Sequence, residues 1–526
     1  MLETYYDIAK KDQFGEFFKD TAIIHNPTSE RNSYLILKLD FAPVRGEMSL
    51  VEDSFEHYNQ GVLDVFLRKY KEYFEEDFFV ELKTHKTFSD KLNYLMNYSK
   101  LKGIKIYLLL DEYDNFANTI LASEGQDMYT KLTRGEGFFR HFFSMLKGAT
   151  SGSGAALSRM FITGVSPITM DDVTSGFNIG NNISLLENVN ELLGLTFEEV
   201  YQIIDYYIDK GIIKKEDKEF HYDLMSKWYN NYKFAKRADT KVFNTDMVLY
   251  YIDKVIATRY PPEDMIDDNV TTDYKKLRYL MTLDSKLNGN FSCLNEISAK
   301  QEIKVEIKKS FPVHKLLDKN NFISLLFYLG LLTRDRVEQG EEYFRIPNYT
   351  IKYLHSDYIK EAYEDMDIFN LDINQYRSIM VGMAYRGEWK ELFDYLAQQI
   401  KDQTKLRDYL NGEKMVHGFM LAYLNITKIF IITSEYEANK GFADIYIEPF
   451  FLNYPDAKYS YLLELKYISR KEYSEEKKNE KYQEALSQMD KYIKDKNLDP
   501  ANMQTELKKL IIIFRDWELM VAEEIV

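Results

Sequence analysis

Three short apolar segments in the first third of the chain are separated by stretches long enough to form helices. They read YLILKLDF at residues 34–41, IKIYLLL at 104–110 and MFITG at 160–164. Continuous apolar runs of this length are typical of strands buried on both faces, and their alternation with helical patterns, such as that at 54–98, favours a parallel sheet. We therefore expect an α/β fold built on a doubly wound parallel sheet.

The remainder of the chain changes character twice. A chain of 526 residues has room for two to four domains. Residues 192–363 show a mostly helical pattern. After a further helical stretch at 367–410, a helix is expected at 415–424, strands at 429–437, 442–448 and 459–467, a helix at 474–496 and a strand at 510–514. The sequence thus predicts a parallel-sheet domain over 1–190, a helical middle domain over 191–363, for which a winged-helix-like arrangement is one option, and an α/β domain with a helical lead-in over 364–526.

Cysteine content and local hydropathy indicate the compartment. The single cysteine, Cys293, excludes an intrachain disulfide framework and a cysteine-based zinc cluster. Residues 1–11 contain four charged side chains and no apolar core, unlike a signal peptide. The longest strongly apolar run, at 322–332, is too short to span a bilayer. We expect a soluble, cytoplasmic protein without a membrane partner, and its oligomeric state stays open.

The net charge of −16 argues against a surface that is broadly suited to nucleic acid. The charge is uneven, however, because residues 401–526 hold 19 Lys and Arg against 22 Asp and Glu, which is only −3 of the net charge of −16. Many of these bases fall between residues 466 and 496. A contact with nucleic acid is therefore expected to be local and C-terminal, although a solvated helix of mixed charge explains the same pattern.

Two acids and a lysine near the C-terminus form a candidate catalytic set. Glu464 and Lys466 lie two residues apart on an expected strand, so their side chains share a face. Antiparallel pairing with the preceding strand would bring Asp444 beside Glu464. Two adjacent carboxylates repel unless a cation lies between them, and oxygen ligands of this kind suit Mg²⁺. A nearby ammonium can orient water and offset charge on a phosphate.

An exposed cross-strand ion pair is the common explanation for a Glu-x-Lys sequence on a strand. The setting of this pair favours a functional role instead, because Leu462, Leu463 and Leu465 place the pair inside an apolar run. Gly441 adds a turn residue shortly before Asp444. The charged residues therefore interrupt a buried strand rather than extend a polar face.

Four segments carry a resemblance to a known family: SE at 434–435, GFAD at 441–444, ELK at 464–466 and ALSQMDKY at 485–492. Together they resemble the C-terminal, restriction-endonuclease-like PD-(D/E)XK nuclease domain of bacterial AAA-ATPase-like proteins. The resemblance implies that Asp444 and Glu464 bind Mg²⁺, that Lys466 is catalytic and that Gln488 supports the site from the following helix.

The same resemblance suggests that Glu435 completes the metal shell, with Glu437 as the competing candidate. One departure concerns the substrate: Phe442 and Ala443 occupy the place of an arginine-containing pair, so a basic contact is missing.

The strand at 104–110 leads into Asp111 and Glu112, an arrangement that resembles a Walker B motif. A helix-capping aspartate after a buried strand is the alternative. Thr163 follows the third apolar segment in a sensor-like position, where α/β sheets bind ligands, with a simple turn as its alternative. Segments 34–44, 108–115, 161–167, 228–234 and 322–333 resemble the same two-part family in order.

The sequence contains no G-x-x-x-x-G-K-[ST] phosphate loop. The glycine-rich segment 148–154 lacks the lysine and precedes a strand rather than a helix. In the family, the phosphate loop lies upstream of a helix that ends much like residues 1–7, so we expect a truncated P-loop-type sheet. Without the loop, no backbone amides cradle the phosphates. ATP as a ligand stays open, and ATP hydrolysis is expected to be weak or absent.

The leading hypothesis is a Mg²⁺-dependent nuclease that hydrolyses phosphodiester bonds of DNA or RNA and is coupled to a degenerate or truncated ATPase-like regulatory module. The alternative is a non-catalytic switch or scaffold that binds a nucleotide or a partner.

Overall fold

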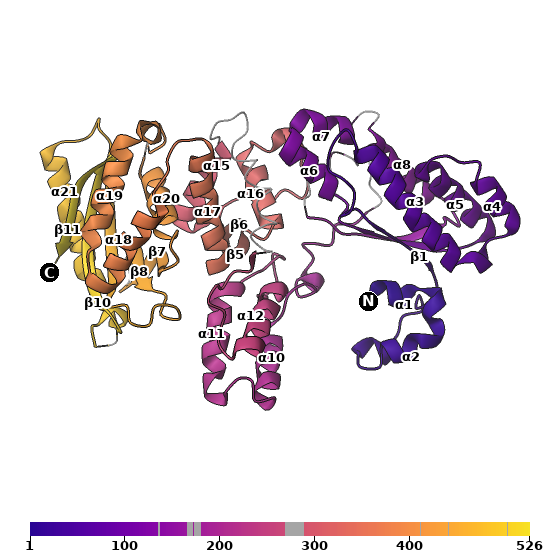
Figure 1. The fold of residues 1–526 in the computed structure, drawn as a ribbon, viewed down its shortest axis with the longest axis horizontal. Helices are drawn as coiled ribbons and strands as arrows, with labels where there is room; N and C mark the ends of the chain where they lie inside the picture. Colours follow the sequence, from indigo (N-terminus) through magenta and orange to yellow (C-terminus); the bar gives the residue numbers. More distant parts are fainter. Residues whose placement is uncertain are drawn as a thin grey trace. The chain divides into compact units, whose positions relative to one another are not determined.

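The computed structural model describes residues 1–134, 137–165, 172, 180–268, 289–410, 412–439, 441–501 and 503–525 (Figure 1). The chain divides into two compact units. One contains Met1–Asn182 and Ile307–Leu329, and the other contains Ile183–Glu306 and Gly330–Val526. Within these described ranges, the helices are either too short or too polar to cross a membrane.

The first unit is built on a three-stranded parallel sheet. Its strands are β1 (Leu35–Asp40), β2 (Ile106–Asp111) and β3 (Leu157–Ile162), in the order β1-β2-β3. Leu37 pairs with Leu108, and both side chains are fully buried. The three apolar segments thus form the parallel sheet that their sequence predicts.

The first unit also contains helices, most of which lie between these strands in sequence (Figure 1). They are α1 (Leu2–Tyr6), α2 (Phe14–Phe17), α3 (Val51–Lys69), α4 (Glu76–Leu82), α5 (Phe88–Lys102), α6 (Asn115–Glu124), α7 (Gln126–Thr133), α8 (Phe138–Ala149) and α16 (Lys319–Tyr328). The helical pattern at 54–98 is therefore divided among α3, α4 and α5. Phe41, Phe55 and Phe116 pack with ring centroids 5.1–6.1 Å apart, so these aromatic residues form core.

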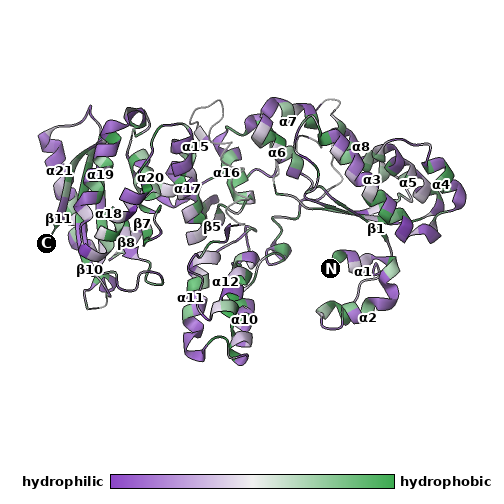
Figure 2. Cartoon of the chain, in the orientation of Figure 1, coloured by the Kyte–Doolittle hydropathy of each residue, from purple (hydrophilic) through white to green (hydrophobic). Residues whose placement is uncertain are grey.

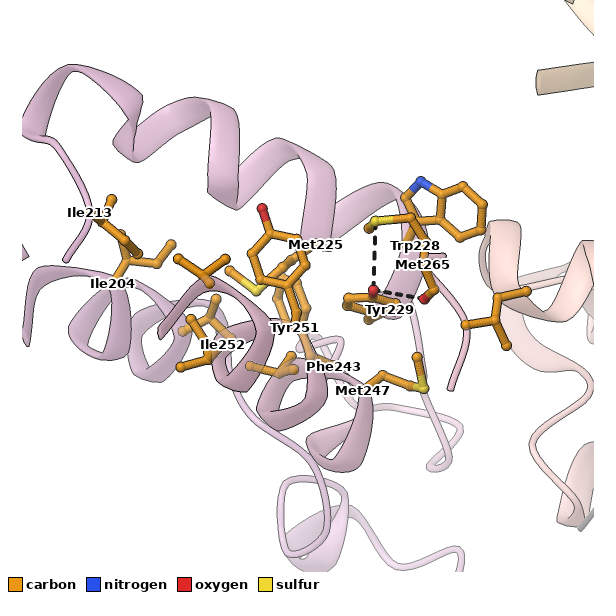
Figure 3. Close-up of a cluster of buried hydrophobic side chains, with 14 of the residues drawn as sticks. Ile204, Ile213, Met225, Trp228, Tyr229, Phe243, Met247, Tyr251, Ile252 and Met265 are labelled. Carbon is orange, nitrogen blue, oxygen red and sulfur yellow. Dashed lines mark hydrogen bonds between the residues drawn. The ribbon is translucent and has the colours of Figure 1, made fainter. Parts of the chain in front are cut away.

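The second unit begins with three helices, α10 (Phe197–Asp209), α11 (Lys218–Tyr229) and α12 (Thr245–Thr258). Figure 3 shows their shared apolar core, in which Ile204, Met225 and Ile252 meet. The hydroxyl of Tyr229 donates a 2.8 Å hydrogen bond to the carbonyl of Met265, which satisfies its buried polar atom. Hydrophobic and hydrophilic residues alternate along these helices in Figure 2, as expected for helices with one buried side.

A small sheet interrupts the helical middle of the chain. It contains β4 (Glu302–Lys304), β5 (Thr333–Glu338) and β6 (Glu341–Arg345), paired antiparallel in the order β4-β6-β5. The helices α15 (Gly289–Lys300) and α17 (Tyr349–Asp365) precede and follow these strands in sequence. No strand is expected here from the sequence, because these strands are short and largely polar.

The C-terminal part of this unit contains a five-stranded mixed sheet. The order is β11-β10-β9-β8-β7, with β9 and β10 parallel and the other pairs antiparallel. The strands are β7 (Phe430–Ala438), β8 (Gly441–Pro449), β9 (Tyr459–Ile468), β10 (Glu506–Arg515) and β11 (Glu518–Ile525).

Helices cover this sheet on both faces. The helix α21 (Glu475–Tyr492) connects the parallel strands β9 and β10 and packs on β8, β9 and β10. The helices α18 (Ile373–Arg386), α19 (Trp389–Asp402) and α20 (Glu413–Leu424) also contact the sheet. Tyr461 points to α18, where its hydroxyl donates to the carbonyl of Met383, whereas its neighbour Leu462 packs with Met489 of α21. The two faces of β9 therefore meet different helices.

Candidate active site

The strand register brings acidic residues from neighbouring strands to one level of the C-terminal sheet. Ile445 of β8 pairs with Leu463 of β9 in an antiparallel ladder, so Asp444 stands opposite Glu464. In the ladder of β7 with β8, Ser434 pairs with Ile445 and Tyr436 pairs with Ala443, so Glu435 stands opposite Asp444. Asp444 and Glu464, which are directly opposed on regular strands, project from the same face of the sheet. Glu435 lies close enough that the charge of Asp444 acts on its carboxyl and its own charge acts on Glu464. Glu435, Asp444 and Glu464 thus form a row across β7, β8 and β9.

Asp444 is held from two sides. Its Oδ2 accepts a 2.6 Å hydrogen bond from the backbone amide of Leu465. Burial raises the pKa of Asp444, although this hydrogen bond and the charge of Lys466 act in the opposite direction. The ring of His417 in α20 is hydrogen-bonded to the backbone of Asp444, and burial lowers the pKa of His417 to about 4. His417 is therefore a neutral support that the sequence did not reveal, because a single histidine in an apolar helix carries no signal of its own.

Glu464 and Lys466 form a buried ion pair. Lys466 Nζ donates a 2.7 Å hydrogen bond to Glu464 Oε1, and the Glu464 residue is 0% exposed. The second oxygen, Oε2, is buried without a hydrogen-bond partner. Burial and the charge of Asp444 raise the pKa of Glu464. Burial acts to lower the pKa of Lys466, but the charge and hydrogen bond of Glu464 outweigh it, so this pKa is raised and the ammonium stays charged.

The helix α21 contributes polar side chains to the same face. Ala485 and Met489 are buried and anchor the helix. Gln488 donates from Nε2 to the hydroxyl of Tyr492 at 3.5 Å, and its Oε1 is buried without a partner. Glu484, one turn earlier, lies 3.8 Å from the ammonium of Lys466. The helix therefore places an uncommitted carbonyl oxygen near the acidic row.

Tyr492 fastens this helix to the start of β8. Its hydroxyl donates a 2.6 Å hydrogen bond to the carbonyl of Phe442. A Cβ atom at Gly441 would lie 2.8 Å from Tyr492 Cε1, closer than side chains tolerate. The glycine thus permits the close approach of the tyrosine ring to the strand that carries Asp444.

Glu435 interrupts the regular geometry of β7. Its φ is +50°, in the left-handed region that a residue other than glycine rarely adopts. Desolvation and the nearby charge of Asp444 raise the pKa of its carboxyl to about 7, although the residue as a whole is exposed. Glu437, the competing candidate, is exposed and stands opposite Phe442. The register thus favours Glu435 as the acid beside Asp444.

The fit of this row to a metal ion can be judged from its donor atoms. The described residues contain no ready-made group of three His, Cys, Asp or Glu side chains close enough to hold a metal. Asp444 and Glu464 nevertheless combine raised pKa values, adjacent negative charge and one unpartnered buried oxygen. Mg²⁺ commonly takes only one or two carboxylates and keeps several waters. These two residues therefore fit a Mg²⁺ ion.

In the first unit, the structure brings Asp111 and Thr163 together. The Thr163 hydroxyl donates a short hydrogen bond to Oδ1 of Asp111, at the C-terminal ends of β2 and β3. Glu112 has a φ of +51°, so the chain turns sharply directly after β2. Its side chain accepts a 3.5 Å hydrogen bond from Asn115. The expected sensor-like segment extends to Ser166 and Pro167, which lie outside the described residues.

Asp114 organises this turn, a role that the sequence analysis missed. Its residue is fully buried, and it accepts hydrogen bonds from the Val165 amide at 3.0 Å and from Asn118 at 2.8 Å. A Cβ atom at Gly164 would lie 2.5 Å from Asp114 Oδ1. The sequence DEYD at 111–114 could have indicated this role, because it places a third acid, Asp114, two residues after Glu112.

Comparison with known families assigns both ends of the chain. The family model described as Predicted AAA-ATPase matches residues 1–174, and that of the PD-(D/E)XK nuclease superfamily matches residues 411–524. The first range contains β1, β2 and β3, and the second contains the acidic row, Lys466 and Gln488. Searches of curated proteins and of solved structures found no match. The resemblance of the two regions to these families is confirmed.

Proposed function

We propose that this chain, which carries an AAA-ATPase-like N-terminal region and a C-terminal PD-(D/E)XK nuclease domain, is a Mg²⁺-dependent nuclease that hydrolyses phosphodiester bonds. One observation carries the proposal: Glu464 Oε2 is buried without a partner on the residue that faces Asp444 and binds the ammonium of Lys466. A structural ion pair alone would not require this unpaired oxygen, which costs free energy unless a ligand uses it.

Each residue of the site has a role in this proposal. Asp444 and Glu464 would hold Mg²⁺, and Glu435 would complete the set of acidic ligands. When bound, Mg²⁺ supplies Lewis-acid activation of the phosphodiester and of water. Lys466 has further N–H donors beyond the one used by Glu464, and one of these would stabilise the negative charge that develops on a phosphate oxygen.

Gln488 supports the same chemistry from α21. Its Oε1 is an acceptor without a partner, and Tyr492 fixes the amide through its Nε2. We assign this oxygen to a hydrogen bond from the attacking water, which it would orient toward the phosphate. His417 and Tyr492 position the strands and do not contact the substrate.

The N-terminal region is assigned a regulatory role without ATP turnover. The sequence contains no phosphate-loop motif, and Asp111 is engaged by the hydroxyl of Thr163. ATP hydrolysis needs both a phosphate cradle and acids on the metal and the attacking water. Asp111, Glu112 and Thr163 supply polar groups for the metal and the attacking water but no phosphate cradle.

The decisive experiment is cleavage of labelled single- and double-stranded DNA and RNA by the purified full chain in Mg²⁺. Lys466→Met should reduce the rate about 100- to 1,000-fold, the typical loss when a group that stabilises transition-state charge is removed. Lys508→Met is the matched control, because Lys508 lies on the neighbouring strand and pairs with Glu524 at 2.8 Å. Equal cleavage by the wild type and Lys466→Met would refute the assignment.

The alternative, a switch or scaffold that does not cut, draws on the same ion pair. Lys466 and Glu464 already satisfy one another at 2.7 Å, as a purely structural pair would. Calorimetric titration with Mg²⁺ separates the two functions. Heat of binding in the wild type that disappears in Asp444→Asn supports the nuclease, and the absence of binding in both supports the scaffold.

A further inference from the structure

A basic pocket lies on the first unit, where α3, α4 and α5 meet. It has a volume of about 320 Å³. Four bases line it, Arg68, Lys71, Lys83 and Lys91, against one acid, Asp64. In a chain with a net charge of −16, this is a marked local excess of positive charge.

Three of these cations have no carboxylate partner. Arg68, Lys71 and Lys83 are exposed, and no ion pair within the described part of the chain involves them. By contrast, the neighbouring Lys69 pairs with the buried Asp7 at 2.7 Å. Basic side chains elsewhere on this unit form ion pairs with acids, whereas among the described residues these three at the pocket do not.

The single acid of the pocket is restrained by a hydrogen-bonded chain. Lys91 donates to Gln60 at 2.9 Å, and Gln60 donates to Asp64 at 2.8 Å. This chain keeps Asp64 at the α3 side of the pocket and draws positive charge toward it. The remaining three cations are thus free to bind an external anion.

Helix ends explain part of this arrangement. Arg68 lies in the last turn of α3, and Lys83 caps the end of α4, where positive side chains interact favourably with the helix dipole. The dipole does not explain why the ends of two helices and Lys71 converge on one pocket. That convergence is what a ligand with several negative charges would require.

An aromatic ring completes the lining. Phe79 is half-buried and packs edge-on against Phe78, with centroids 5.3 Å apart and an interplanar angle of 82°. It packs edge-on against Phe74 as well, at 80°. Two buried rings therefore fix the orientation of Phe79. A fixed, partly exposed ring beside several cations is the combination that binds single-stranded nucleic acid, through base stacking and phosphate contacts.

We propose that this pocket binds the backbone of single-stranded nucleic acid, with Arg68, Lys71 and Lys83 on the phosphates and Phe79 as a stacking platform for a base. The identity of the ligand rests on the proposed nuclease function, but the pocket is separate from the residues assigned to cleavage. It would give the first unit a direct role in holding the substrate.

The test measures binding of a fluorescein-labelled oligothymidylate to the full chain in EDTA, by fluorescence anisotropy over a range of salt concentrations. The variant with Arg68→Ala, Lys71→Ala and Lys83→Ala should bind at least tenfold more weakly. Its slope of log affinity against log salt should fall by about 2, because each phosphate contact to a single strand contributes about 0.7. Phe79→Ala should weaken binding about tenfold and leave the slope unchanged.

A control variant removes the same charge elsewhere on this unit, through Lys11→Ala, Lys19→Ala and Lys105→Ala at three exposed lysines. It should bind within about twofold of the wild type. Unchanged affinity in the pocket variant, or an equal loss in the control, overturns the proposal. Competition by base-free polyphosphate as strong as that by the oligonucleotide overturns it too, since it would remove the role of stacking.

Cleavage in Mg²⁺ distinguishes this proposal from the nuclease assignment. If the wild type cleaves, Lys466→Met does not, and the pocket variant binds normally, the pocket proposal fails and the nuclease stands. If the pocket variant binds weakly while no protein cleaves, the nucleic-acid site is supported and the nuclease assignment fails.

Discussion

The backbone amide of Leu465 donates a 2.6 Å hydrogen bond to Oδ2 of Asp444. This amide belongs to the residue between Glu464 and Lys466, so the carboxylate from β8 is fixed beside the two charged side chains of β9. One oxygen of Asp444 is used by this bond. The second can face Glu464, and the cost of that proximity underlies the first prediction.

Replacing Asp444 by Asn should stabilise the metal-free protein and abolish its response to Mg²⁺. Asn keeps an acceptor for the Leu465 amide but removes a half-buried charge that raises the pKa of Glu464. We expect the free energy of unfolding in EDTA to rise by about 1 kcal/mol, because removing one of two repelling charges at a functional site usually stabilises the fold. Chemical denaturation with and without Mg²⁺ measures both effects. A less stable variant that still responds to Mg²⁺ would contradict the site.

The carboxyl of Glu435 should make metal-free stability depend on pH. Its pKa is raised from 4.5 to about 7, so the folded state keeps a proton that the unfolded state has lost. This contribution to stability is fully present below pH 4.5 and is lost as the pH rises through about 7. Melting temperatures of Glu435→Gln should therefore fall less across this window than those of the wild type. Glu437→Gln, at an exposed position two residues along β7, should retain the wild-type profile.

The Tyr492 hydroxyl should matter for both stability and cleavage. Tyr492→Phe removes the 2.6 Å hydrogen bond to the Phe442 carbonyl and the contact that orients Gln488. The expected loss is about 1 kcal/mol of stability, with a lower cleavage rate at saturating substrate. Tyr482→Phe, on the same helix, is the control: it removes a hydrogen bond with Glu523 of β11 and should leave the cleavage rate unchanged. A normal rate in Tyr492→Phe would remove Gln488 from the mechanism.

ATP turnover should be at background level. A phosphate-release assay on the full chain should give the same rate for the wild type and for the double variant Asp111→Asn and Glu112→Gln. The reason is that these acids act on a nucleotide only when its phosphates are cradled, and the sequence lacks the motif that does so. A wild-type rate well above that of the double variant would restore an active ATPase.

The sequence predicted the elements whose signal is local. The apolar runs were sufficient to predict β1, β2, β3 and β9, because runs of this kind are typical of strands in a sheet covered on both faces. The strand β3 is nevertheless only partly buried, and β9 carries Glu464 and Lys466 within its apolar run. The spacing of Glu464 and Lys466 fixed their common face. The strand β11 was missed since its residues include Glu518, Glu523 and Glu524 and lie half in solvent.

Other features depend on contacts that no local pattern reveals. The position of Glu435 opposite Asp444 follows from the pairing of β7 with β8, and the bent backbone there has no glycine to announce it. His417 and Asp114 act through buried hydrogen bonds to distant backbone groups. Gln488 was identified only through the resemblance of its segment to a family, because a glutamine in a charged helix does not by itself indicate a functional role.

The row of Glu435, Asp444 and Glu464 ties chemistry to correct folding. Each acid comes from a different strand, and a shift of β9 by one residue would turn Glu464 and Lys466 to the opposite face and present Leu463 or Leu465 in their place. A chain that pairs its strands wrongly therefore cannot assemble a partly working site. An enzyme able to cut nucleic acid would in this way stay harmless to its host until its sheet is complete.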